Sequence, residues 1–165
     1  MENNTLAAII EITDKISGNL LIDVIDSIYK NGNTDSKRAA VAIIKSGYEP
    51  DNVDFDGYHW TIDGDDYQIY TDSEADEALT DYIGGSVWAF NSDFLSEQTG
   101  IDSEVFTLLQ GKCEDSNLAI LKLIEGSCGL SDFIENAVST DGRGSFLSSY
   151  DGEEIEFNGW FFYRI

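Results

Sequence analysis

Hydrophobic residues recur three or four positions apart over the first 46 residues, which is the spacing of an amphipathic helix. Gly18 and Asn31-Gly32-Asn33 interrupt this pattern, so it predicts three consecutive helices. We expect residues 1–48 to form an N-terminal helical segment and residues 49–165 to form a separate acidic α+β domain. One continuous domain over residues 1–165 is the alternative.

The same spacing returns later in the chain and predicts one long helix over about residues 72–97. Thr71 and Glu74 match the capping box that begins many helices, in which each side chain bonds a free backbone N–H group. Gly84-Gly85 lowers the helix propensity within this stretch, so we expect a kink or close packing there. Three shorter helices are predicted between residues 102 and 138.

Two stretches rich in aromatic and β-branched residues, 58–70 and 154–164, are typical of β-hairpins. The turn of the second hairpin is Asn158-Gly159, a pair that readily adopts the positive φ angles of a type I′ turn. The turn of the first contains Asp63-Gly64. No long third strand is evident, so we expect both hairpins to share one small antiparallel sheet that packs with several helices. This arrangement predicts the α+β fold class.

Charge is the least ordinary property of the sequence. The chain has 32 acidic residues against nine Lys and Arg, a formal net charge of -23. Residues 46–111 contain 16 of the acidic residues and no Lys or Arg, although an average composition would place several cations there. Nucleic acids and anionic membranes bind basic surfaces, so we expect direct binding to neither. The charge suits a cationic partner or adaptation to high salt.

Carboxylates of residues 63–81 are the main candidate site. Carboxylates four residues apart on a helix stand about 6 Å apart along its axis. Successive phosphates of a DNA strand advance about 3.4 Å axially, but they lie farther apart through space because the strand also winds, so the two spacings are comparable. Carboxylates also accept bidentate arginine contacts, as phosphates do. No Lys or Arg lies within helical reach, so we expect an unpaired surface that imitates a nucleic-acid backbone. A solvated face without a specific role is the alternative. The predicted partner-binding residues are Asp63, Asp65, Asp66, Asp72, Glu74, Asp76, Glu77 and Asp81.

Residues 52–63 match the spacing of a calcium-binding loop, with oxygen-bearing side chains at its first, third, fifth and twelfth positions and Gly57 at its sixth. Two of these side chains are not the usual ones, and a strand rather than a helix follows the loop. A solvated turn is therefore the alternative to a calcium site. The ligands of this loop would be Asn52, Asp54, Asp56 and Asp63.

The sequence contains none of the common catalytic signatures. His59 is the only histidine and lies in a predicted strand, and Cys113 and Cys128 have no neighbouring Cys or His at metal-ligand spacing. Neither a nucleophile elbow nor a phosphate-binding glycine loop occurs. We therefore expect neither an enzyme nor a bound cofactor.

Four segments carry a resemblance to a known group of proteins. They are residues 70–78 (Tyr-Thr-Asp-Ser-Glu-Ala-Asp-Glu-Ala), residues 82–95 with Val-Trp-Ala-Phe-Asn-Ser-Asp-Phe-Leu, residues 113–117 (Cys-Glu-Asp-Ser-Asn) and residues 141–154, which begin Asp-Gly-Arg-Gly-Ser-Phe-Leu. Over about residues 67–157 the sequence resembles small accessory proteins of unknown function encoded by tailed bacteriophages. The resemblance implies a phage source and an accessory role, which makes salt adaptation a weaker explanation of the charge.

Charge and resemblance together predict a non-enzymatic phage inhibitor in the host cytoplasm, where it binds a cationic, nucleic-acid-binding host protein of defence or replication. Anti-restriction and anti-CRISPR proteins are examples of this class. The sequence has no apolar run as long as the roughly 18 residues of a membrane span and no secretory leader, in keeping with this location. The alternatives are an interaction module or homodimer that uses a sheet edge or an exposed aromatic patch at Trp160, Phe161 and Phe162, or a weak calcium-binding protein.

Overall fold

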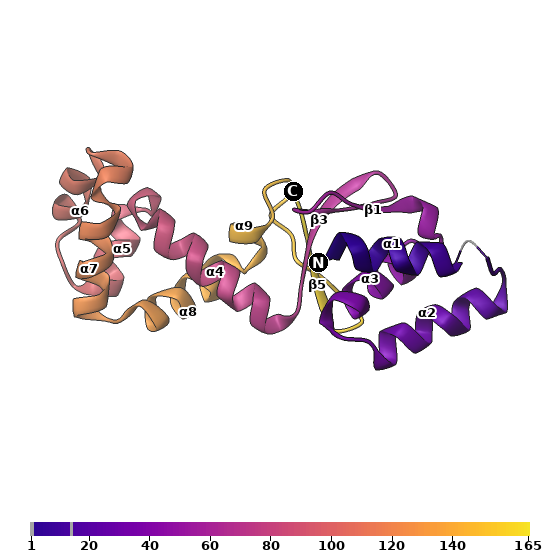
Figure 1. Ribbon diagram of the computed structural model, residues 1–165. Coiled ribbons are helices and arrows are strands. Elements are labelled where there is room, and N and C mark those ends of the chain that lie inside the picture. The colour runs from indigo at the N-terminus through magenta and orange to yellow at the C-terminus, as the bar shows by residue number, and fades with distance from the viewer. Residues whose placement is uncertain (1, 14) are drawn as a thin grey trace. The chain divides into compact units, whose positions relative to one another are not determined.

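The computed structural model describes residues 2–13 and 15–165, with side chains from residue 5 onward, and its fold class is α+β, as predicted. The chain divides into two compact units (Figure 1). Unit 1 comprises Met1–Ala75 and Ser148–Ile165, and unit 2 comprises Asp76–Leu147. This division differs from the expected boundary between residues 48 and 49. The C-terminal hairpin pairs with a strand of unit 1, so the two ends of the chain belong to the same unit.

Three helices open unit 1, as the hydrophobic pattern predicts: α1 (Glu2–Thr13), α2 (Asn19–Asn31) and α3 (Thr34–Lys45). The side chain of Asn33 caps α3 by accepting a hydrogen bond from the Ser36 amide, which explains why a helix begins directly after this turn. Six consecutive residues of α3, Arg38 to Ile43, are buried. Because α3 contacts α1, α2 and the sheet, it is the centre of this unit.

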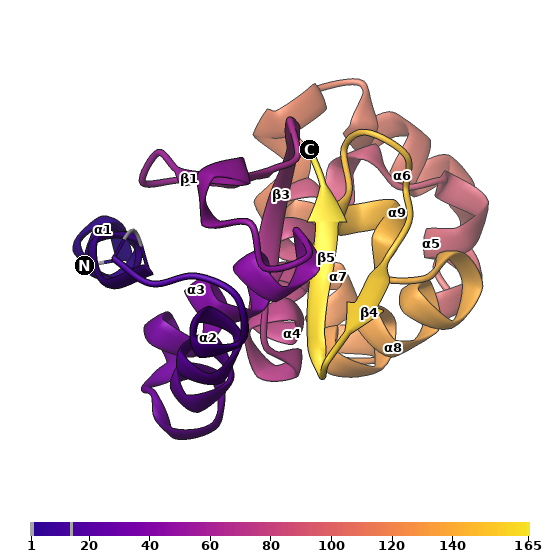
Figure 2. The ribbon, with the colours of Figure 1, turned by 90° about the vertical axis from the view of Figure 1, so that its right-hand side faces the viewer.

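A five-stranded antiparallel sheet completes unit 1. A 3₁₀ turn, η1 (Pro50–Asn52), leads into β1 (Val53–Phe55), β2 (Trp60–Ile62) and β3 (Asp65–Tyr70), and the chain returns with β4 (Ile155–Phe157) and β5 (Trp160–Arg164). The strand order is β1-β2-β3-β5-β4, and Figure 2 shows β5 between β3 and β4. Both predicted hairpins are therefore confirmed, in one shared sheet. Strand β1 was not predicted from the sequence.

The turns of the two hairpins have the backbone angles that their sequences favour. Asn158 and Gly159 have φ angles of 52° and 73°, and Asp63 and Gly64 have φ angles of 52° and 90°. Positive φ at both central residues is the requirement of a type I′ turn, which matches the twist of antiparallel strands. Local sequence therefore fixes both registers, which place Trp60 opposite Tyr67 and Phe157 opposite Trp160.

Unit 2 is entirely helical. Most of α4 (Asp72–Ser86) belongs to it, followed by η2 (Val87–Ala89), α5 (Ser92–Thr99), α6 (Ser103–Gln110), η3 (Cys113–Ser116), α7 (Asn117–Ser127), α8 (Leu130–Asp141) and α9 (Gly144–Leu147). Its buried cluster contains aromatic and aliphatic side chains of α4 to α8, among them Leu79, Phe106 and Phe133. In the part of the chain that is described, no helix is long and apolar enough to cross a membrane.

The helix predicted over residues 72–97 ends at Ser86, and α5 is a separate helix. The side chain of Asn117 on α7 explains the break. Its Nδ2 donates to the carbonyl of Gly84 at 2.7 Å, and its Oδ1 accepts from the amide of Trp88 at 3.2 Å. These two backbone groups would bond each other in a continuous α-helix, so the amide of Asn117 is inserted in place of that bond.

Asn117→Ala should lower the free energy of unfolding by about 1–3 kcal/mol, because it removes the partners of a backbone carbonyl and a backbone amide. Asn136→Ala is the matched control. The exposed side chain of Asn136 donates to the side chain of Gln98, so its replacement should change stability by no more than about 0.5 kcal/mol. Urea denaturation followed by circular dichroism measures both changes. Equal effects of the two substitutions would show that the Asn117 bridge does not stabilise the break.

Candidate functional site

The eight predicted carboxylates are divided between the two units. Asp63, Asp65, Asp66, Asp72 and Glu74 lie in unit 1, whereas Asp76, Glu77 and Asp81 lie in unit 2. Their environments also differ, because some are held by hydrogen bonds and ion pairs, whereas Glu77 and Asp81 form none through their carboxylates with a described residue. The expectation of a uniformly unpaired surface is therefore wrong, and each group is described by its own contacts.

Glu74 has a structural role at the start of α4. Its carboxylate accepts hydrogen bonds from the backbone amide and the hydroxyl of Thr71 at 2.8 and 2.9 Å, and the Thr71 hydroxyl accepts one from the Glu74 amide at 3.3 Å. These bonds confirm the predicted capping box. The carboxylate also forms an ion pair with the buried guanidinium of Arg38, which lies 5.4 Å from the ring centroid of Trp160. Glu74 thus connects α3 with α4.

Three carboxylates at the sheet of unit 1 are also held by nearby side chains. Asp65 pairs with Arg164 across the β3–β5 pair. Asp66 accepts a hydrogen bond from the Thr61 hydroxyl at 2.7 Å, and Asp63 accepts one from the Asn52 amide at 2.9 Å. Asp72, at the first position of α4, is exposed.

In unit 2, one of the three predicted carboxylates is paired and two are not. Asp76 bonds the guanidinium of Arg143 at 3.1 Å. Glu77 and Asp81 are exposed and form no hydrogen bond or ion pair through their carboxylates with any described residue. They are four positions apart on α4, which places them about 6 Å apart along the helix axis.

All thirteen acidic residues of unit 2 are exposed, and within the described chain only Asp76 takes part in an ion pair. Most of them were not among the partner-binding residues predicted from the sequence. Asp93 and Glu97 repeat the four-residue spacing on α5, and Asp132 and Glu135 lie three residues apart on α8. The sequence signal that could have identified these two pairs is their position relative to the apolar residues Leu95 and Phe133, which are buried. That position places each pair away from the buried face of its helix.

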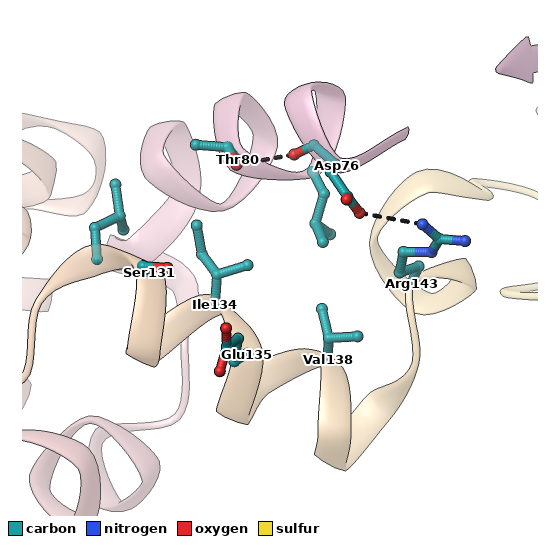
Figure 3. Close-up of a pocket in the computed structure, with 9 residues that line it drawn as sticks. Asp76, Thr80, Ser131, Ile134, Glu135, Val138 and Arg143 are labelled. Carbon is teal, nitrogen blue, oxygen red and sulfur yellow. Dashed lines mark hydrogen bonds and ion pairs between the residues drawn. The ribbon is translucent and has the colours of Figure 1, made fainter. Parts of the chain in front are cut away.

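A groove between α4 and α8 is the second feature of unit 2. Its volume is about 470 Å³, and Leu79, Leu130, Ile134 and Val138 supply its apolar walls. Figure 3 shows the side chains of Ile134 and Val138 extending from α8 toward α4. The lining residues with polar groups are Asp76, Thr80, Ser131, Glu135 and Arg143.

One end of the groove is closed by charge pairing. The Asp76–Arg143 ion pair lies there, as Figure 3 shows, and the side chain of Arg143 is only 15% exposed. The hydroxyl of Thr80 donates to the Asp76 carbonyl of its own helix. Glu135 forms no hydrogen bond or ion pair through its carboxylate with a described residue. The groove therefore combines apolar walls with an unpaired negative charge.

The predicted calcium loop does not form. Val53–Phe55 form strand β1, so Asn52 and Asp56 lie beyond opposite ends of an extended segment instead of on a curved loop. Asp56 accepts hydrogen bonds from the amides of Tyr58 and His59, which lower the pKa of its carboxyl. Asp54 bonds the Phe55 amide. No group of three or more His, Cys, Asp or Glu among the described residues is placed to hold a metal ion.

The prediction of an exposed aromatic patch at Trp160, Phe161 and Phe162 is also wrong. Trp160 and Phe162 are 6% and 0% exposed and belong to the core of unit 1, and Phe161 is half-buried. They lie on β5, which has a partner strand on each side. The edge strands are β1 and β4, each only three residues long, and short edges limit pairing with another chain.

The fold and these surfaces define an acidic α+β protein with a structural set of carboxylates in unit 1 and an exposed set in unit 2. No family of proteins, no curated protein and no solved structure matches the chain.

Glu74→Gln should make stability less dependent on acidic pH. Partial burial raises the pKa of Glu74, but the hydrogen bonds from Arg38 and Thr71 lower it by more than burial raises it. The pKa of Glu74 therefore lies below its usual value. Ionised Glu74 therefore stabilises the fold above its unfolded pKa of about 4.3, and this stabilisation is lost as the pH falls through the lower, folded pKa. The difference in free energy of unfolding between the natural protein and Glu74→Gln should be largest near pH 7 and shrink below about pH 4.

Urea denaturation at several pH values between 3 and 7 measures this difference. Glu77→Gln is the control, because its carboxylate bonds no described residue, and its effect should stay small at every pH. A difference for Glu74→Gln that remained constant down to pH 3 would contradict the ionised pair with Arg38.

Proposed function

We propose that this protein is a phage-encoded, non-enzymatic inhibitor that binds a cationic, nucleic-acid-binding host protein. The observation that carries the proposal is the exposure of all thirteen acidic residues of unit 2, of which, within the described chain, only Asp76 forms an ion pair and only Asp102 caps a helix through its carboxylate. A fold gains no stability from carboxylates that neither cap a helix nor pair with a cation. Their mutual repulsion costs stability instead. Contact with a cationic partner would relieve that repulsion.

The spacing of these carboxylates supports imitation of a phosphate backbone. Glu77 with Asp81 on α4, and Asp93 with Glu97 on α5, each present two charges about 6 Å apart along a helix axis. A groove lined with Lys and Arg that follows DNA phosphates meets charges at comparable intervals. Each carboxylate can accept two N–H groups of an arginine. Each pair therefore offers contacts of the kind that such a groove makes with neighbouring phosphates.

The net charge of -23 also favours fast association with a cationic protein and opposes association with anions. It opposes contact between two copies of unit 2, each with the same exposed carboxylates, so a homodimer through this surface is disfavoured. The resemblance to phage accessory proteins supplies the biological setting. A host protein of restriction, CRISPR defence or replication, acting in the host cytoplasm, has the required basic groove.

Binding of a DNA-binding host protein should fall as salt rises and should compete with DNA. Purified DNA-binding restriction, CRISPR and replication proteins, each bound to a fluorescent duplex, are titrated with this protein, and release of the duplex is followed by anisotropy. A target should release its duplex at 50 mM salt and require a much higher concentration of the protein at 300 mM, because salt screens exposed charges. Release of no duplex from the panel, or release unaffected by salt, would contradict the proposal.

Two sets of four substitutions distinguish the effect of the unit 2 carboxylates on binding from the effect of net charge. Glu77→Gln, Asp81→Asn, Asp93→Asn and Glu97→Gln together should weaken competition about tenfold or more, at a few tenths of a kcal/mol to about 1 kcal/mol per exposed pair. The control set is Asp23→Asn, Asp51→Asn, Glu153→Gln and Glu156→Gln, which are exposed residues of unit 1. It changes the net charge equally and should have a much smaller effect. Equal effects would mean that net charge, not this surface, decides binding.

A further inference from the structure

The groove between α4 and α8 is unusual on a surface that is otherwise acidic. Its walls are four aliphatic side chains, and only Leu79 among them is fully buried. Leu130, Ile134 and Val138 remain half-exposed at the edge of the unit 2 core. A volume of about 470 Å³ falls within the range of about 300–1,000 Å³ found for ligand sites. The groove can therefore take apolar groups that would otherwise meet water.

Charge around the groove limits the chemistry of its occupant. The one cation in its lining, Arg143, is paired with Asp76 and mostly buried, so it is not available to an anionic ligand. Glu135 lines the same groove with a carboxylate that bonds no described residue. An anionic amphiphile would meet repulsion there, and so would a second copy of this acidic chain. An occupant with both an apolar face and positive charge satisfies the walls and the carboxylate together.

We infer that the α4–α8 groove anchors a basic amphipathic segment of the partner protein. Apolar side chains of that segment lie against Leu79, Ile134 and Val138, and a Lys or Arg beside them pairs with Glu135. Long basic side chains suit this position, because their aliphatic stems pack on apolar walls while the charged end reaches a carboxylate. The closed end at Asp76–Arg143 limits how far the segment extends in that direction.

This inference rests on the proposed function and adds a second kind of contact to it. Exposed carboxylates alone attract any basic protein, since their field is long-ranged and nonspecific. An apolar groove discriminates among basic partners, because burial needs matching shape and fails with a segment that has no apolar face. The groove therefore selects the partner, and the surrounding charge speeds the encounter.

Two synthetic peptides of identical Leu and Lys composition test the inference. One arranges the leucines on a single helical face, and the other has the same residues in an order without an apolar face. Both carry a fluorophore and are titrated with the full chain at 150 mM salt. The amphipathic peptide should bind at least tenfold more tightly. Any binding due to charge alone would be the same for both.

Two variants and one control test whether this preference arises in the groove. Thr80→Trp fills the rim from an exposed helical position and should abolish the preference for the amphipathic peptide. Glu135→Gln should weaken that peptide severalfold more than Glu125→Gln, a control on the exposed side of α7. Circular dichroism checks that each variant folds, and shifts of the methyl resonances of Leu79, Ile134 and Val138 on peptide binding report contact without any substitution.

Equal binding of the two peptides, or a preference that survives in Thr80→Trp, would overturn the inference. Methyl shifts confined to other parts of the chain would overturn it as well. A different experiment, the release of fluorescent DNA, tests the proposed function. That function would be contradicted if the protein released DNA from no nucleic-acid-binding protein of the panel. Release of DNA together with equal peptide binding would therefore leave the proposed function intact and reject the groove alone.

Discussion

Pairing between arginines and carboxylates is the interaction on which the rest of the structure depends. The chain has three arginines, and each binds a carboxylate of the acidic stretch between Asp63 and Asp81: Arg38 binds Glu74, Arg164 binds Asp65 and Arg143 binds Asp76. All three arginines lie outside the cation-free residues 46–111. Two of the pairs hold segments of unit 1 together, α3 with the first turn of α4 and β3 with β5, and the third lies at one end of the groove in unit 2. An arginine can bond two partners at once, which suits it to these junctions.

This use of the arginines divides the acidic residues into two sets. Carboxylates near packed segments are bonded, as Glu74 and Asp66 are, whereas most carboxylates of unit 2, apart from Asp76 and the helix cap Asp102, are exposed and bond no described residue. A chain with few cations cannot neutralise both sets. The proposed recognition surface is thus the part of the negative charge that the fold does not use, which is why it is found on unit 2 rather than along the whole acidic stretch.

Features set by a few neighbouring residues could be predicted from the sequence. The Thr71–Glu74 capping box, both hairpin turns and the three N-terminal helices each depend on local backbone preferences and appear as expected. Features that depend on distant partners could not be predicted. The sequence shows that residues 46–111 lack cations, but not that arginines from both flanks reach them. The groove likewise needs α4 and α8 to face each other, and neither helix shows this in its own pattern.

Strand β1 was missed because a dense run of Asp resembles a metal-binding loop. Val53 and Phe55 alternate with Asp54, which is the pattern of an edge strand, and Val53 is buried. Charged residues on an edge strand also discourage pairing with another chain. The carboxylates that suggested calcium are thus consistent with a role in protecting the sheet edge.

The inserted amide of Asn117 has a consequence for the order in which the chain can become structured. The end of α4 at Gly84 is completed by a residue 33 positions later, so the α4 terminus cannot reach its final geometry until α7 has been synthesised and has docked. During translation the first turns of α4 have their own cap at Thr71, but the last turn lacks its partner. The break that ends α4 is therefore expected to form only after residue 117 has been synthesised, although α4 itself is a local structure.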